Sequence, residues 1–151
     1  SKKWGDVAKK IGLKNSRPLI ENGLGAIGEL EEEMNYTDFI GKIRALLDCT
    51  YVRYTRPKKE QVKTIALCGG SGAEFIGEAI AQGADVYITA DCKYHEFQDA
   101  EGRIGLMDID HWISERHARE IFLDFIGNLG LDCRISKTDK TPILLWQEQK
   151  N

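Results

Sequence analysis

A histidine and a glutamate four residues apart, His111 and Glu115, are the side chains of this sequence best suited to chemistry. On a helix this spacing places both side chains on one face, one turn apart. An imidazole and a carboxylate in that arrangement can bind one divalent cation, and mixed nitrogen and oxygen ligands suit zinc, iron or manganese. Asp108 and Asp110 precede the pair and add negative charge that offsets the cation-repelling helix N-terminus. The pattern predicts part of a metal site, because zinc usually takes three or four protein ligands.

The same two residues also fit an ordinary helix start with a solvated histidine and a favourable acidic residue. Their position favours the metal hypothesis, because ligands in open α/β sheets bind beyond the carboxyl ends of strands. Asp91 and His95 follow another expected strand end and are the nearest candidates for completing a site. His95 is a candidate catalytic residue, suited to general acid or base catalysis, and Asp91 is a candidate ligand-binding residue or a helix cap.

A glycine-rich turn, Gly69-Gly70-Ser71-Gly72, joins an expected strand to an expected helix. Backbone N–H groups in such a turn can surround an anionic ligand. No Gly-Lys-Ser/Thr follows, which excludes a Walker loop, and Glu74 in the first helical turn would repel a phosphate. Two interpretations stay open, a tight turn whose glycines permit close packing and a cradle for a small anion.

The elements that must position these residues alternate between strands and helices. Strands are expected at 51–55, 64–69, 86–89, 105–109, 133–136 and 143–146. Helices are expected at 3–11, 37–47 (with Thr37 as N-cap), 71–82, 93–101 and 111–129. The glycine-rich segment Lys14–Glu33 is interpreted as loop and extended chain. The alternation predicts an α/β fold with a mixed, largely parallel sheet and flanking helices in three layers.

Composition restricts the class of protein. With 151 residues and 42% hydrophobic content, the chain is large enough for one globular domain with its own core. A formal net charge of -3 argues against a nucleic-acid or membrane-surface binder, and the basic group around Arg53–Lys63 is interpreted as a solvated linker. No apolar run is long enough to span a bilayer. The four cysteines form no Cys-x-x-Cys pair, which argues against a zinc ribbon. A chain that can build its own core does not need a disulfide framework, so a reducing cytoplasm is expected. Cys92 is the one candidate for a reactive or ligand thiol.

Five short motifs follow one another in an order and at spacings that resemble the Nif-three-like family, whose members are often labelled GTP cyclohydrolase 1 type 2 homologues. Each motif is weak alone, and the resemblance extends from about Gly23 to the C-terminus. The motifs are Gly23–Leu30, Cys68–Gly72, Gly83–Asp91, Lys93–His95 and Asp110–Glu115.

The resemblance implies an α/β protein of two similar halves that assembles into a toroidal hexamer, with two divalent metal ions per subunit facing an internal cavity. The family's C-terminal metal ligands carry over to His111 and Glu115. The Gly and Thr of that motif are Asp110 and Ser114 here, and the family's Thr-Gly-Asp appears as Thr89-Ala90-Asp91.

The remaining ligands of the family, including a His-His pair, lie in an N-terminal half, and this sequence has no histidine before His95. We therefore expect residues 1–151 to form one domain, the C-terminal portion of a longer protein, with residues 1–22 as a lead-in segment. Such a portion would supply half of a di-metal site, bind metal weakly or not at all when alone, and lack catalysis.

Three functions stay open at this stage. The first is a metal-dependent hydrolase of the cyclohydrolase label, with His95 near a small-molecule substrate that the sequence does not identify. The second is a non-catalytic metal-carrying or regulatory oligomeric interaction protein, which the same ligands would serve. The third is a purely structural α/β domain in which His111 and Glu115 are solvated.

Overall fold

The computed structural model describes residues 2–21, 24–49, 51–69 and 72–109. These residues form a mixed six-stranded sheet in the order β1-β2-β4-β5-β6-β3. The strands are β1 (Lys14–Arg17), β2 (Ala26–Asn35), β3 (Arg53–Tyr54), β4 (Gln61–Leu67), β5 (Val86–Thr89) and β6 (Gly105–Asp108). β4, β5 and β6 run parallel, whereas the pairings β1–β2, β2–β4 and β3–β6 are antiparallel.

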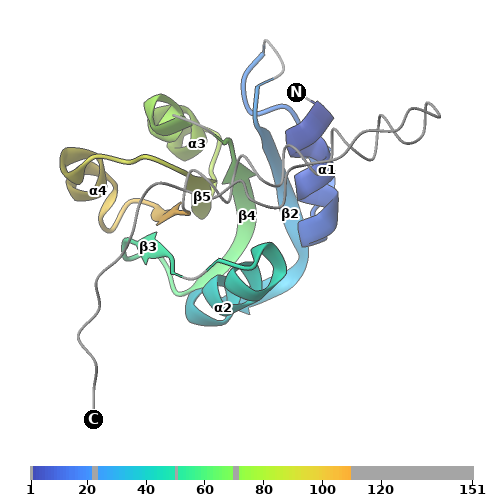
Figure 1. The fold of residues 1–151 in the computed structure, drawn as a ribbon, viewed down its shortest axis with the longest axis horizontal. Coiled ribbons are helices and arrows are strands. Elements are labelled where there is room, and N and C mark those ends of the chain that lie inside the picture. The colour runs from blue at the N-terminus through green and yellow to red at the C-terminus, as the bar shows by residue number, and fades with distance from the viewer. Residues whose placement is uncertain (1, 22–23, 50, 70–71, 110–151) are drawn as a thin grey trace, which may run out of the picture.

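Helices cover both faces of this sheet (Figure 1). One face carries α1 (Lys2–Ile11) and α2 (Tyr36–Leu47), which pack with the sheet around buried side chains such as Ile43 and Ile65. The other face carries a 3₁₀ turn (Gly72–Phe75), α3 (Ile76–Ala81) and α4 (Tyr94–Ala100), which pack around Tyr87 and Leu106. The predicted three-layer α/β arrangement is confirmed. The expected lead-in segment contributes α1 and β1, and Val7, Ala8, Ile11 and Leu19 are buried.

The three parallel strands end at one edge of the sheet, here called the carboxyl edge. Ile88 of β5 lies opposite Leu67 of β4, and Thr89 lies opposite Asp108 of β6. Asp85 fixes this alignment at the other ends of the strands, because its Oδ2 accepts hydrogen bonds from the backbone N–H groups of Lys63 (2.8 Å) and Thr64 (2.9 Å). The residues that follow each parallel strand are therefore brought together.

Three expectations about local structure need correction. The interpretation of Lys14–Glu33 as loop and extended chain holds only in part, because its extended parts are the paired strands β1 and most of β2. Gly28 lies in β2 because neighbouring backbone is close, and an added Cβ would come within 2.8 Å of the Lys14 carbonyl oxygen. The N-cap of α2 is Asn35 instead of Thr37, since the Asn35 side chain accepts from the Thr37 N–H at 2.9 Å. Asp91 does not cap α4, whose N-cap is Lys93.

Other elements lie close to their expected bounds. The strand expected at 86–89 is β5, and the helices expected at 3–11 and 93–101 are α1 and α4 to within a residue. The helix expected at 111–129 and the strands at 133–136 and 143–146 lie outside the described residues. Within the part of the chain that the structure describes, no helix has the length and apolar character needed to cross a membrane.

Candidate functional site

The carboxyl edge collects most of the described candidate residues. Gly69 and Gly72 follow β4, Asp91 and His95 follow β5, and Asp108 ends β6. Of the other candidates, Gly70, Ser71, His111 and Glu115 lie outside the described residues. The polar contacts at this edge centre on Asp108, which the sequence suggested only as a source of local charge.

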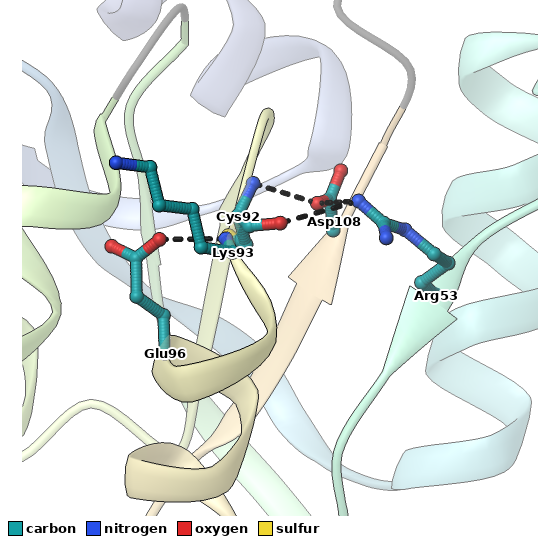
Figure 2. Close-up of polar contacts among 5 residues, drawn as sticks. All are labelled: Arg53, Cys92, Lys93, Glu96 and Asp108. Carbon is teal, nitrogen blue, oxygen red and sulfur yellow. Dashed lines mark hydrogen bonds and ion pairs between the residues drawn. The ribbon is translucent and has the colours of Figure 1, made fainter.

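Asp108 joins three separate segments of the chain (Figure 2). Its Oδ2 accepts a hydrogen bond from Nη2 of Arg53 at 2.6 Å and another from the backbone N–H of Cys92 at 2.9 Å. The same Arg53 nitrogen lies 3.4 Å from the Cys92 carbonyl oxygen, to which it also donates. The Asp108 side chain is only 4% exposed, so a buried carboxylate links β3, the β5–α4 loop and the end of β6.

Burial and charge shift the acidity of the groups in this cluster. Burial raises the pKa of Asp108, and the Cys92 N–H and Arg53 act in the opposite direction because they stabilise the carboxylate. Burial, followed by the negative charge of Asp108, raises the pKa of the Cys92 thiol to about 12. Cys92 is also buried, and a buried thiol with a raised pKa carries little of the nucleophilic thiolate, which argues against the candidate reactive thiol.

Asp91 and His95 are exposed, and in the sequence one precedes and the other follows the buried Cys92. Asp91 has a left-handed backbone conformation, with a φ of 58°. His95 lies in the first turn of α4, which is held by a hydrogen bond of 2.6 Å from the Lys93 N–H to Oε1 of Glu96. An exposed imidazole beside a strand end is accessible to a small molecule, which general acid or base catalysis requires.

The glycine-rich turn packs tightly where it is described. An added Cβ at Gly72 would come within 2.7 Å of Thr89 Oγ1 and 2.9 Å of Tyr87 Oη. The Tyr87 hydroxyl donates a buried hydrogen bond of 2.6 Å to the Gly72 carbonyl oxygen. This geometry supports the close-packing interpretation at Gly72. The anion cradle stays a prediction, because half of the turn lies outside the described residues.

The described residues do not form a metal site by themselves. Among them, no group of three or more His, Cys, Asp or Glu side chains is close enough to hold a metal ion. The Asp108 carboxylate accepts hydrogen bonds from Arg53 and from the Cys92 N–H, which are its partners in place of a metal ion. A metal at this edge would therefore need ligands beyond the described residues.

Arg53 is the functional candidate that the sequence analysis missed, because it was grouped with the solvated basic residues of a linker. Its partner Asp108 is 55 positions away in the sequence. The expected strand at 51–55 contains Arg53, but the partner is shown only by the antiparallel β3–β6 pairing, in which Arg53 lies opposite Asp108. A cationic partner stabilises a carboxylate buried at a strand end.

Comparison with known proteins assigns the chain to a family. The sequence profile of the Duf34/NIF3 family, described as NGG1p interacting factor 3, matches residues 5–142. The chain belongs to the Duf34/NIF3 family. The resemblance inferred from the five motifs is thereby confirmed for nearly the whole chain.

Two curated relatives of this Duf34/NIF3 chain are each named GTP cyclohydrolase 1 type 2 homolog. The one from Staphylococcus aureus (strain MRSA252) is 37% identical over 91 residues, which cover 60% of this chain and 25% of the relative. The one from Nostoc sp. is 30% identical over 132 residues, which cover 83% of this chain and 50% of the relative. The chain thus spans a quarter to a half of the length of the relatives it matches.

The fold is also found in a solved structure. The crystal structure of Staphylococcus aureus hypothetical protein SA1388 superimposes with a TM-score of 0.76 at 23% sequence identity. The superposition covers 95% of this chain and 64% of that chain. The similarity confirms the mixed α/β fold with flanking helices.

Proposed function

We propose that this Duf34/NIF3 chain supplies part of a divalent-metal site through His111 and Glu115, in a protein that acts as a metal-dependent hydrolase. The observation that carries the proposal is the common edge at which β4, β5 and β6 end. Glu115 and His111 follow the last residue of β6 by seven and three positions. Three residues of extended chain reach at most about 11 Å, and this short connection supports the proposal that His111 acts at this edge.

The residues around that edge suit a hydrolytic reaction. A divalent cation would supply Lewis acidity there. His95 is exposed on the same edge, and imidazole is the group most often used to move a proton in such reactions. Asp91, also exposed, is the second polar side chain we propose to face a small-molecule substrate.

The complete protein is needed for this activity in our proposal. The chain spans no more than half of the curated relatives' length, and two ligands leave a metal ion incompletely coordinated. We propose that the missing ligands come from the rest of the protein and that the functional form is a homo-oligomer. A metal-carrying protein without catalysis is the alternative that the experiment must separate.

The first test measures metal bound to the full-length protein by mass spectrometry after reconstitution with zinc, iron or manganese. His111→Ala and Glu115→Gln should each lose metal. His117→Ala is the matched control, since the helix expected at 111–129 would put it on a different face from Glu115, and it should keep the wild-type content. Wild-type protein without metal under these conditions would refute the proposal, as would full metal content in both ligand variants.

The second test separates a hydrolase from a metal carrier. The metal-loaded protein is incubated with GTP, the nucleotide in the relatives' names, and products are followed by chromatography. We expect turnover by wild-type protein, and a loss of turnover with retained metal in His95→Ala. Bound metal without turnover of GTP or of a panel of other small-molecule substrates would favour the carrier.

A further inference from the structure

The ion pair at the carboxyl edge joins a buried carboxylate to a half-exposed guanidinium. Arg53 and Asp108 pair at 2.6 Å, and the Asp108 side chain is 4% exposed. Removing a carboxylate from water costs free energy, and its attraction to a cation largely offsets that cost instead of adding stability. One attested role of a buried charge is to fix one geometry among several.

The geometry fixed here is that of the β5–α4 loop. Asp108 accepts the Cys92 N–H at 2.9 Å, and Arg53 donates to the Cys92 carbonyl oxygen at 3.4 Å, so both backbone polar groups of one loop residue are held. The Arg53 guanidinium also lies over the Phe97 ring of α4, 5.0 Å from its centroid. Figure 2 shows Arg53 and Asp108 reaching Cys92 from the two neighbouring strands.

We infer that Arg53 and Asp108 are positioning residues, which clamp Cys92 and thereby orient Asp91 and His95 at the carboxyl edge. Asp91 is adjacent to Cys92, and His95 follows it by three residues in a helix of seven residues. A short helix held at its first residues and at Phe97 has little freedom to turn. The inference rests on the proposed function, in which Asp91 and His95 face the substrate.

The guanidinium group has a specific part in this clamp. Its Nη2 donates to both acceptors while the planar group lies over the Phe97 ring, and an ammonium group on a flexible stem does not reproduce that planar stacking. The Arg53 side chain is 55% exposed, so its replacement does not open a cavity in the core. Arg53 is therefore the better residue for a test, and Asp108→Asn is the second variant because it keeps the shape and an acceptor for the Cys92 N–H.

The test is hydrogen exchange by mass spectrometry on the full-length protein, with peptides that carry residues 90–95. In Arg53→Met we expect exchange at Cys92 to accelerate about tenfold, as for the loss of one charge-assisted hydrogen bond. Arg53→Lys should recover part of the protection, and Asp108→Asn should lie between. The matched control is Arg56→Gln, three residues after Arg53 in the sequence, which removes an exposed ion pair with Glu101.

The outcomes separate the clamp from the proposed function. Unchanged exchange in Arg53→Met, or equal acceleration in Arg56→Gln, would overturn the clamp. The same proteins are then assayed for manganese content and for GTP turnover. Loss of turnover in Arg53→Met with manganese retained supports positioning of His95, whereas wild-type turnover in a variant with an open loop would overturn it. A wild-type protein without metal or turnover would refute the proposed function. The exchange result would still show whether Arg53 and Asp108 clamp Cys92.

Discussion

Replacing Gly72 with alanine should destabilise the protein, because three buried groups surround the place of the new Cβ. The Cβ would meet Thr89 Oγ1 at 2.7 Å, Tyr87 Oη at 2.9 Å and the Cβ of Cys68 at 3.1 Å. None of these neighbours is the end of a flexible surface side chain, and all three are buried. Relief of the clash requires the glycine-rich turn to move away from β5.

The cost has two parts. Overpacking of a core by one methyl group costs about 1–3 kcal/mol. Movement of the turn also breaks the buried hydrogen bond from Tyr87 to the Gly72 carbonyl oxygen, which contributes about 0.5–1.5 kcal/mol. We expect the free energy of unfolding to fall by about 2–4 kcal/mol. The urea midpoint would fall by roughly 1–2 M at an m-value of about 2 kcal/mol/M.

Urea denaturation of matched variants measures this cost. Gly77→Ala is the control, since a Cβ there meets nothing within 4 Å and alanine favours the helix by up to about 1 kcal/mol. Tyr87→Phe removes the hydrogen bond alone and should cost about 1 kcal/mol. If Gly72→Ala unfolds at the wild-type urea concentration, the close-packing interpretation of this turn is refuted and the anion cradle becomes the better explanation of the glycine.

Three further predictions concern other described residues. The pKa of Cys92 is about 12, against 9.0 for an ordinary thiol, so Cys92 should react with iodoacetamide at pH 8 about a thousandfold more slowly than a free thiol. Rapid labelling of its peptide in folded protein would contradict this. Asn35→Ala should lower the free energy of unfolding by about 1 kcal/mol, whereas Asn35→Asp should keep the cap of α2, as urea denaturation can check. Burial raises the pKa of Tyr36, Tyr87 and Cys92, so folded protein keeps protons that the unfolded chain releases, and stability should fall as pH rises beyond about 9. A urea midpoint equal at pH 8 and pH 10 would rule out that linkage.

Local patterns were sufficient for the centre of the sheet. The run Val86–Thr89 is apolar and bounded by turn residues, and it is β5 as predicted. The position of Asp91 and His95 beyond its end followed from the same reasoning. Parallel strands at the centre of an α/β sheet are buried on both faces, so their sequence signal is continuous and does not depend on distant residues.

Distant contacts explain what the sequence could not predict. Gly28 suggested a loop, yet it lies in β2 and is glycine because an added Cβ would come within 2.8 Å of the Lys14 carbonyl oxygen of β1. The pairing of Arg53 with Asp108 depends on β3 being next to β6, which no local pattern near either residue shows. Cys92, the candidate reactive thiol, is buried as well, which no local pattern shows.

The place of β3 in the sheet also affects how the protein is made. β3 precedes β4 in the sequence, but it pairs beyond β6 at the end of the strand order. Arg53 leaves the ribosome 55 residues before Asp108, a wait of roughly 3–11 s at 5–20 residues per second. A chain interrupted before β6 would contain the glycine-rich turn and the residues of α4. It would still lack β6, the strand with which Arg53 of β3 pairs at this edge.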